Sequence, residues 1–337
     1  MIIAHDDPCL SWHGHISLET TREYTRPWRI PFVEKEMFFP ELSVRAAEPS
    51  GVRIAFHTTT RKISGGILLH EEPRFLDLCV NGNFLSRQAL KNRETFLFRN
   101  LPSGEKLIEL WLPQKGDFAL RWLELDAGTP IRAFDDTRKR WITYGSSITQ
   151  CRGAISPTQT WPALVAREEN LNLTNLGLSG QCHLDPLMAL ILREISADFI
   201  SVCAGINVYA DGSLNARTFA SGLIGFVRIV REKHPETPLA IISPIISPSR
   251  ENLANVAGWT LRQYREAVLG SVETLRKLGD QRIFSVDGTE LFGENLLRLM
   301  PDGLHPDAEG YRLLGQNFLR NVAPSLFRET PISPSLP

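Results

Sequence analysis

The 337-residue sequence contains no apolar run long enough to cross a bilayer. Its longest apolar stretches, such as Pro238 to Ile246, are broken by proline, whereas a membrane-spanning helix needs roughly 20 apolar residues. Residues 1–10 also lack the basic start and the apolar stretch that mark a secretory signal. We therefore expect a protein that does not act in a membrane and that is located in the cytoplasm.

An excess of positive charge is also missing. The 37 Lys and Arg residues are balanced by 38 Asp and Glu residues, which gives a formal net charge of -1. A protein that binds nucleic acid usually presents a basic surface to the phosphates, and this composition provides no general excess for one. Nucleic acid is therefore not an expected partner.

Cysteine is rare, and its spacing forms no pattern. The chain has five cysteines, an odd number, and no Cys-x-x-Cys pair occurs. Neither a disulfide framework nor a structural zinc site is therefore indicated. His13 and His15 have a spacing that two metal ligands could use, but no carboxylate or cysteine pattern accompanies them, which favours a surface strand. We expect free thiols, no metal and no organic cofactor. The five cysteines are Cys9, Cys79, Cys151, Cys182 and Cys203.

The first part of the chain has the pattern of an antiparallel β-structure. Val52 to Thr59 alternates apolar and polar residues, and Asn81-Gly82 interrupts Phe75 to Leu85 with a strong hairpin signal. Closely spaced strands of this kind predict a β-sandwich or jelly-roll-like domain, which we place at residues 1–135. Further short β-rich segments are Phe96–Phe98, Lys106–Leu112 and Phe118–Leu125.

After a polar stretch at Ala133–Arg140, which has the composition of a linker, short apolar strands alternate with helices. This alternation predicts a parallel sheet covered by helices on both faces, in a domain that we place at residues 136–325, followed by a disordered tail at 326–337. The predicted strands are Trp141–Tyr144, Leu173–Leu176, Asp198–Cys203, Pro238–Ile242 and Ile283–Val286. The predicted helices are Thr160–Glu169, Leu187–Ile195, Ala216–Lys233, Leu261–Leu278 and Asp307–Leu319.

Small and polar residues directly follow three of these strands, at the edge where an open parallel sheet binds its ligands. These segments are Gly145–Thr149, Gly177–Gln181 and Gly205–Asn207, and Asp302 and His305 stand just before the last helix. A serine hydroxyl becomes a useful nucleophile when an imidazole takes its proton and a further acceptor orients that imidazole. Ser147, His305 and Asp302 provide these three groups.

Acyl transfer also needs hydrogen-bond donors for the oxyanion that develops on the substrate. The candidates are the backbone amides of Ser147 and Gly180 and the side-chain amide of Asn207. His183 lies three residues after Gly180 and is a candidate substrate-binding residue, because it could line the acyl pocket. The alternatives for His183 are a competing base and a structural role.

Alternatives remain for the carboxylate that orients His305 and for the nucleophile itself. Asp287 or Glu290 could replace Asp302 as the partner of His305, although a helix cap is the more ordinary role for them. Cysteines near the polar segments could serve as a thiol nucleophile, but small buried side chains are the better interpretation. These cysteines are Cys151, Cys182 and Cys203.

The polar segments resemble the four sequence blocks of the SGNH (GDSL-type) hydrolases, a superfamily of esterases and acyltransferases. The resemblance covers Trp141 to Val322 and departs at Ser146, where the family usually has Asp. It implies a flavodoxin-like three-layer α/β/α fold, Ser147 as nucleophile, Gly180 and Asn207 in the oxyanion hole, and Asp302 and His305 as the rest of a triad. The matching blocks are Gly145–Thr149, Asn175–Gly180, Gly205–Asn207 and Asp302–His305.

With a β-sandwich ahead of such a domain, the chain is similar to two-domain carbohydrate esterases and to certain acyltransferases of natural-product pathways. We expect a serine esterase that hydrolyses small O-acyl esters, with acetylated carbohydrates as one such class. One alternative is an acyltransferase that passes the acyl group to an alcohol of a metabolite. The other is a non-catalytic glycan-binding protein, in which aromatic residues of the first domain stack on sugars instead of packing in a core. These aromatic residues are Trp12, Trp28, Trp111 and Trp122.

Overall fold

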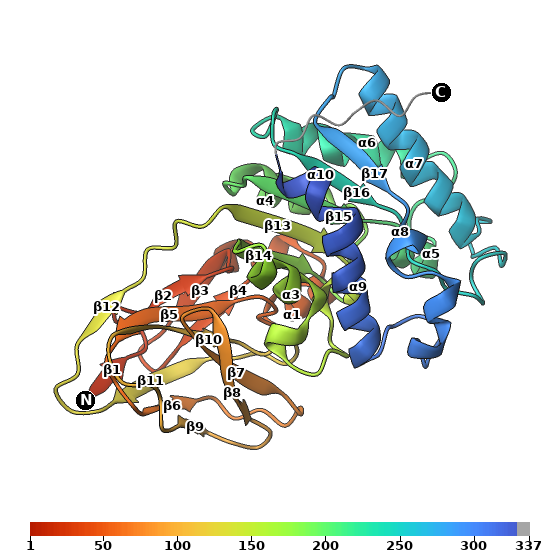
Figure 1. Cartoon of the computed structure of the whole chain (residues 1–337). Helices are drawn as coiled ribbons and strands as arrows, with labels where there is room; N and C mark the ends of the chain where they lie inside the picture. The colour runs from red at the N-terminus through yellow and green to blue at the C-terminus, as the bar shows by residue number, and fades with distance from the viewer. Residues whose placement is uncertain (329–337) are drawn as a thin grey trace. The chain divides into compact units, whose positions relative to one another are not determined.

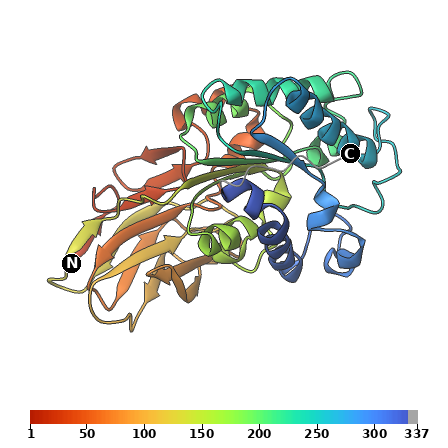
Figure 2. The same ribbon diagram turned by 45° about the horizontal axis from the view of Figure 1, so that its top comes forward.

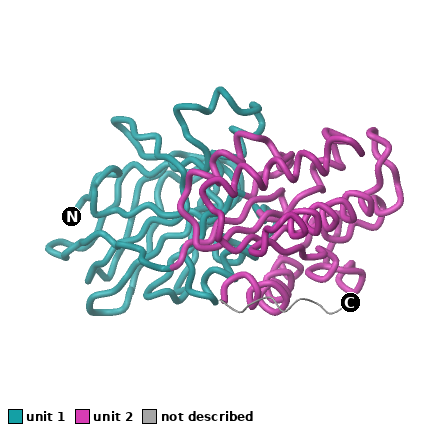
Figure 3. Tube along the Cα trace, turned by 90° about the horizontal axis from the view of Figure 1, so that it is seen from above, with its two compact units in different colours: residues 1–138, 150–176 teal, residues 139–149, 177–337 magenta. Residues whose placement is uncertain are grey.

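The computed structural model describes residues 1–328, and these residues form two compact units (Figures 1 and 3). Unit 1 contains Met1–Arg138 and Gln150–Leu176, and unit 2 contains Lys139–Thr149 and the chain from Gly177 onward. The tail predicted at 326–337 lies outside the described residues beyond Arg328, whereas Leu326 and Phe327 end helix α10 (Ala323–Phe327). Within the described part, no helix has the length and hydropathy that crossing a membrane requires.

Unit 1 is built on two six-stranded antiparallel sheets. The first sheet has the order β3-β4-β11-β6-β9, with β1 also paired to β11, and the second has the order β12-β5-β10-β7-β8, with β2 also paired to β5. The strands of the first sheet are β1 (Ile2–Ala4), β3 (Ser17–Thr20), β4 (Thr25–Trp28), β6 (Ile63–Ile67), β9 (Thr95–Phe98) and β11 (Leu120–Leu125). The strands of the second are β2 (Ser11–His13), β5 (Arg53–Thr58), β7 (Phe75–Val80), β8 (Asn83–Ala89), β10 (Lys106–Trp111) and β12 (Ile131–Ala133). The predicted antiparallel β-sandwich is therefore confirmed.

One apolar core lies between the two sheets, because alternate residues of each strand point toward the other sheet. In β9, for example, Phe96 and Phe98 are buried in this core while Thr95 and Leu97 are exposed. The predicted hairpin between β7 and β8 turns at Asn81 and Gly82, whose φ angles of +50° and +78° suit these two residue types. Core members from the two sheets include Ile54, Phe56, Leu78, Ile108, Ile63, Leu120 and Leu123.

The aromatic residues considered for sugar stacking are mostly packing residues. Trp28 and Trp111 are buried, and Trp12 is partly buried and packs against the core of the sandwich.

Short helices complete unit 1. They are η1 (Phe32–Met37), α1 (Pro40–Ala46), η2 (Pro157–Gln159) and α3 (Trp161–Glu168), and the strand β14 (Asn172–Gly177) follows them.

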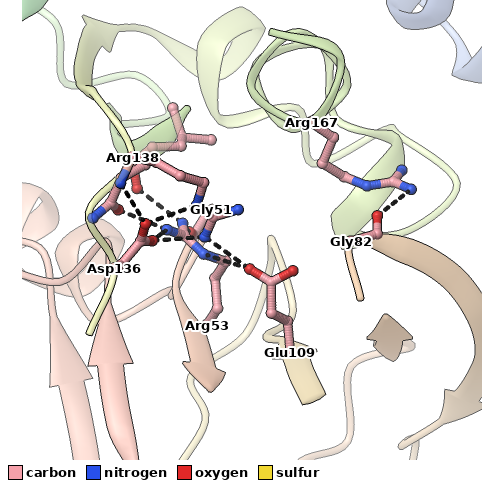
Figure 4. Close-up of polar contacts among 9 residues, drawn as sticks. Gly51, Arg53, Gly82, Glu109, Asp136, Arg138 and Arg167 are labelled. Carbon is pink, nitrogen blue, oxygen red and sulfur yellow. Dashed lines mark hydrogen bonds and ion pairs between the residues drawn. The ribbon is translucent and has the colours of Figure 1, made fainter. Parts of the chain in front are cut away.

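The stretch expected to be a linker contains two residues of a buried ionic cluster (Figure 4). Asp136 lies 3.2 Å from the Arg53 guanidinium and 2.6 Å from that of Arg138, which also contacts Glu109 at 2.9 Å. Arg53 donates a further hydrogen bond of 2.6 Å to the side chain of Asn172. The chain does pass from unit 1 to unit 2 within Ala133–Arg140, after Arg138, but Asp136 and Arg138 have their charges paired inside unit 1.

We expect the substitution Asp136→Ala to lower the free energy of unfolding by about 3 kcal/mol or more, because it leaves Arg53 buried without one of its counter-ions. The side chains of Arg53 and Asp136 are 0% and 1% exposed. Urea denaturation would measure the loss. The matched control is Glu105→Ala, which removes an ion pair with Arg132 at the surface and should not shift the denaturation midpoint measurably. Equal midpoints for the two variants would contradict the prediction.

Three polar residues of the sandwich hold strand β14. Arg53 donates to the carbonyl oxygen of Leu173 at 3.1 Å, and Arg29 donates to that of Asn175 at 3.1 Å. The side-chain amide of Asn175 donates to Ser50 Oγ at 3.1 Å. The strand that leads into the predicted glycine block is therefore fixed by side chains from much earlier in the sequence.

Unit 2 contains a parallel sheet with the strand order β13 (Arg140–Gly145), β15 (Phe199–Cys203), β16 (Leu239–Ile242) and β17 (Ile283–Val286). Both faces are covered (Figure 2), as predicted. Trp141 and Tyr144 lie three residues apart in β13 and therefore point to opposite faces. The Trp141 ring contacts Phe318 of α9 (Ala308–Asn321) at a centroid distance of 5.3 Å, whereas the Tyr144 ring stacks on Phe226 of α6 (Phe219–Arg231). The sequence thus predicted a three-layer arrangement that the structure confirms.

The strands of this sheet begin and end close to the predicted residues. They are β13 (Arg140–Gly145), β15 (Phe199–Cys203), β16 (Leu239–Ile242) and β17 (Ile283–Val286). The helices are α2 (Ser147–Gln150), α4 (Pro186–Glu194), α5 (Ile206–Asp211), α6 (Phe219–Arg231), α7 (Leu261–Lys277), α8 (Gly288–Leu291), η3 (Glu294–Leu299) and α9 (Ala308–Asn321), followed by α10. The main difference lies in the short helix α5, which follows β15 where the sequence indicated only a loop.

Candidate active site

Ser147 stands between the end of β13 and the first turn of α2. The preceding Ser146 is buried, and its hydroxyl accepts a hydrogen bond of 3.2 Å from the Ile148 amide. Ser146 thus provides an oxygen acceptor for this turn where the family usually has Asp. Gly145 is needed for close packing, because a Cβ at this position would lie 2.2 Å from Thr149 Oγ1.

His305 and Asp302 form a hydrogen-bonded chain with Ser147. The Ser147 hydroxyl lies 2.9 Å from Nε2 of His305, and Nδ1 of the same ring lies 2.7 Å from Oδ2 of Asp302. A carboxylate can only accept, so Nδ1 carries the proton and Nε2 presents its lone pair to the serine. The structure thus brings together the nucleophile, base and orienting carboxylate predicted from sequence.

The second oxygen of Asp302 is also occupied. Oδ1 accepts the backbone amides of Leu304 and His305 at 2.9 and 2.7 Å. Partial burial alone would raise the pKa of Asp302, but the hydrogen bonds from the His305 amide, its imidazole and the Leu304 amide outweigh burial and lower this pKa to about 2. The carboxylate therefore remains ionised at neutral pH.

The alternative partners of His305 have other contacts. Asp287 caps helix α8, where its Oδ1 accepts the Thr289 amide at 2.9 Å. Glu290 lies inside the same short helix. Asp302 is therefore the carboxylate that contacts the imidazole.

Gly180 lies in a tight turn whose backbone requires glycine. Its φ of +73° is in the left-handed region, and a Cβ at this position would meet nothing within 4 Å, so conformation and not crowding selects glycine. The turn is tied to the serine segment, because the Leu178 amide donates to the Gly145 carbonyl at 2.7 Å. The glycine block and the serine block are thus held side by side.

Asn207 is buried in the first turn of α5, and its orientation is fixed. Its Oδ1 accepts the Cys182 amide at 3.0 Å, which leaves the side-chain NH₂ group as its remaining polar group. Gly205 precedes it with a φ of +120°, and a Cβ there would lie 2.8 Å from Pro244 Cγ. The hydrogen bond to Cys182 also connects the asparagine block to the glycine block.

His183 contacts the backbone of the glycine turn. Its Nε2 donates to the Gly180 carbonyl at 3.0 Å and lies 3.3 Å from Asp211, while Nδ1 accepts from the Ser213 hydroxyl at 2.8 Å. The His183 ring also lines a pocket of about 480 Å³, together with Leu214 and other residues. These contacts show His183 supporting the turn, and its predicted role in substrate binding stays a prediction.

The cysteines near the site are poor nucleophiles. Burial raises the pKa of the Cys203 thiol to about 12 and raises that of Cys182 as well. Cys151 is fully buried, and Cys182 donates to the Cys203 carbonyl at 3.4 Å. Their environment fits the interpretation as small buried side chains.

Iodoacetamide at pH 8 should leave the expected esterase activity and the three cysteines near the site unchanged, because a thiol with a pKa of about 12 is roughly 10⁻⁴ ionised at that pH. Mass spectrometry of tryptic peptides would measure the modification. Protein unfolded in urea serves as the control, since all five cysteines should then react. Rapid inactivation that tracks modification of Cys203 would contradict this assignment.

The two histidines with metal-like spacing do not form a metal site with other ligands. In the part of the chain that the structure describes, no group of three His, Cys, Asp or Glu residues is placed to hold a metal ion. Burial, with the nearby Arg53 charge, lowers the pKa of His13 to about 4, and burial also lowers that of His15 to about 4. Edge-on contact with Phe134 packs the His13 ring in unit 1.

Comparison with known proteins identifies the family of the chain. Residues 138–323 match the GDSL-like lipase/acylhydrolase family, and the chain belongs to that family. Residues 10–121 match the N-terminal domain of SsfX3. A comparison with curated protein sequences found no match.

Solved structures that are similar over most of this chain include one acyltransferase and several carbohydrate esterases. The chain is 33% identical to the salicylyl-acyltransferase SsfX3 from a tetracycline biosynthetic pathway, over 96% of each chain, with a TM-score of 0.89. A family two carbohydrate esterase from Cellvibrio japonicus is 14% identical over 96% of this chain and 97% of its own, with a TM-score of 0.68. The corresponding enzyme from Clostridium thermocellum, solved with cellohexaose, is 14% identical over 93% and 98%, with a TM-score of 0.64. At this low identity, the esterases share the fold alone.

Proposed function

We propose that the protein is a serine esterase that hydrolyses small O-acyl esters through an acyl-enzyme on Ser147. The observation that carries this proposal is the continuous hydrogen-bonded chain from Ser147 Oγ through both ring nitrogens of His305 to the Asp302 carboxylate. This arrangement gives a serine hydroxyl the general base that it needs to attack a carbonyl carbon. The proposed activity needs neither a metal nor an organic cofactor.

In the first half of the reaction, Ser147 Oγ bonds to the ester carbonyl carbon while His305 Nε2 takes the hydroxyl proton. The negative charge moves to the carbonyl oxygen, where the amides of Ser147 and Gly180 and the NH₂ group of Asn207 would stabilise it. When the tetrahedral intermediate collapses, the bond to the alcohol breaks and His305 returns the proton to the leaving oxygen. In the second half, water attacks the acyl-serine in the same way and releases the acid.

Water as the acceptor is supported by the exposure of the base. The His305 side chain is 38% exposed and that of Asp302 is 53% exposed, so solvent reaches the residues that would activate the second nucleophile. A transferase must instead keep water from competing with its alcohol. We therefore place hydrolysis first, with acetylated carbohydrates as one candidate substrate class.

A second candidate function is transfer of the acyl group to an alcohol of a metabolite. It is favoured by the 33% identity to an acyltransferase over the whole chain and by the match of residues 10–121 to the N-terminal domain of that same protein. Both candidates use the same acyl-enzyme. They differ only in which hydroxyl group attacks it in the second half of the reaction.

Labelling with a fluorophosphonate probe tests the acyl-enzyme, because the reagent requires an activated serine but no knowledge of the substrate. We expect one adduct on Ser147, found by mass spectrometry, and none in the variant His305→Ala.

Turnover of p-nitrophenyl acetate in the presence of added glycerol separates the esterase from the acyltransferase, since hydrolysis gives acetate and transfer gives glyceryl acetate. Failure to label the folded protein, together with no turnover, would instead favour the glycan-binding alternative.

A further inference from the structure

Arg250 lies in the segment between β16 and α7 and is held against the turn that carries His305. Its Nη1 donates to Ser247 Oγ at 2.9 Å and lies 3.5 Å from the carbonyl oxygen of Gly303. Ser247 is buried, and its hydroxyl donates to the same Gly303 carbonyl at 2.7 Å. The guanidinium is therefore fixed at a turn whose neighbouring residues are Asp302 and His305.

The backbone of Arg250 is fixed as well. Its amide donates to the Ser247 carbonyl at 2.9 Å, and its own carbonyl accepts the Leu261 amide at 3.1 Å. Ser247 is in turn held by Glu251, whose Oε1 accepts the Ser247 amide at 3.0 Å. Because both ends of the side chain are restrained, little conformational entropy remains to be lost when the guanidinium binds a further group.

Arg250 is a half-buried arginine of unit 2 with no counter-ion among the described residues, a property that it shares with Arg276 and Arg282 but not with Arg265 and Arg231. Arg265 forms two hydrogen bonds with Glu251 at 2.8 and 2.9 Å, and Arg231 contacts Asp280 at 2.8 and 3.0 Å. Among the described residues, the acceptors of the Arg250 side chain are two serine hydroxyls and a backbone carbonyl, and no carboxylate lies within 4.0 Å of it. A guanidinium has five N–H donors on three nitrogens, and all of these contacts are made by Nη1 alone.

Asp302, in the same turn, forms no ion pair with Arg250 among the described residues. Both oxygens of Asp302 are engaged by His305 and Leu304. The cation is thus left at the exposed turn that presents the base to the substrate. A planar, preorganised guanidinium in such a place is suited to a carboxylate or phosphate group.

We propose that Arg250 binds an anionic group of the substrate, so that the natural ester carries a carboxylate or phosphate close to the bond that is cleaved. This inference rests on the proposed function. It narrows the substrate class from small O-acyl esters in general to anionic ones. The anionic group can belong to the acyl part or to the alcohol part, and the experiment below distinguishes these two.

Two matched pairs of esters test the proposal. In the first pair the acyl part carries the charge: p-nitrophenyl hemisuccinate is compared with p-nitrophenyl pentanoate. In the second pair the alcohol part carries it: 3-acetoxybenzoate is compared with its methyl ester. For each pair, the ratio of kcat/KM for the anionic ester to that for the neutral ester isolates charge recognition, because a general loss of structure lowers both values together.

We expect the ratio in one of the pairs to fall about tenfold in Arg250→Gln, since a charge-assisted hydrogen bond is replaced by a neutral one. Arg250→Lys should restore most of the ratio because it keeps the charge. Arg228→Gln, which removes the same charge from an exposed position in α6, should leave both ratios unchanged. Ratios that do not differ between wild type and Arg250→Gln in either pair would overturn the proposal.

A binding measurement keeps this test separate from the proposed function. Isothermal titration of Ser147→Ala protein with succinate and with 3-hydroxybenzoate needs no turnover. We expect succinate to bind about tenfold more tightly than dimethyl succinate, or 3-hydroxybenzoate to bind about tenfold more tightly than its methyl ester, and we expect Arg250→Gln to abolish this difference. Equal affinities would refute the role of Arg250 even in an active esterase, whereas absence of any Ser147-dependent turnover would refute only the esterase.

Discussion

Replacing Ser147 with alanine should lower kcat/KM for p-nitrophenyl acetate by about 10⁴-fold or more, because removal of a triad nucleophile leaves only the oxyanion donors and binding contacts. The fluorophosphonate adduct should disappear in the same variant. The fold should be unaffected, since the Ser147 hydroxyl contacts His305 at the surface of the site and not the apolar core. Stopped-flow or steady-state absorbance at the p-nitrophenolate band would measure the loss.

The adjacent serine provides a matched control for this substitution. Ser146→Ala removes a hydroxyl that accepts the Ile148 amide at 3.2 Å, and this costs about 1 kcal/mol of local stability. Its kcat/KM should stay within about tenfold of the wild-type value because the hydroxyl belongs to the turn and not to the reacting atoms. If Ser146→Ala abolished labelling and Ser147→Ala did not, the two serines would have to exchange roles.

The substitution Asp302→Asn should lower kcat by about 10⁴-fold while leaving the turn folded. Oδ1 is held by two backbone amides, so the new NH₂ group would replace Oδ2 and face His305 Nδ1. Nδ1 would then have to accept a hydrogen bond, the ring proton would move to Nε2, and the base would lose the lone pair that takes the proton of Ser147. The tautomer, and not the position of the ring, is what this substitution changes.

Asp287→Asn is the control, because Asp287 was the alternative partner of His305 and caps α8 instead. We expect Asp287→Asn to retain wild-type kcat. A comparable loss of kcat in the two variants would contradict the assignment of Asp302.

In the wild type, the pKa of Asp302 in the folded state is about 2, which lies below the ordinary value of an aspartate. The ionised carboxylate therefore contributes its full stabilisation at any pH above that ordinary value, and this stabilisation is lost as the pH falls through about 2.

The parts of the fold that the sequence predicted well depend on local patterns. Asn81-Gly82 predicted a hairpin because its left-handed backbone is accessible to few residue types, and the structure has this turn. The alternation of strands and helices after Trp141 likewise predicted a covered parallel sheet. The order of the candidate blocks identified Ser147, Asp302 and His305, and the fold brings these three side chains into hydrogen-bond contact.

The features that the sequence did not predict depend on contacts between distant residues. Nothing near Asp136 indicates that its partner is Arg53, because the pairing is created only when β5 is placed beside β10 and β12. Arg250 likewise resembles any surface arginine in the sequence. Its distinction is its position, because Nη1 is hydrogen-bonded to Ser247 Oγ and lies 3.5 Å from the carbonyl oxygen of Gly303, and these contacts appear only in three dimensions.

The path of the chain also limits how this protein could be divided or recombined. It passes from one unit to the other after Arg138, after Thr149 and again after Leu176, so no single cut releases a complete unit. Ser147 and Gly180 flank the inserted segment, whose strand β14 depends on Arg29, Ser50 and Arg53. The second half of the sequence, expressed alone, would lose those supports. An engineer who exchanges the sandwich for another domain would therefore have to exchange residues 150–176 together with residues 1–138.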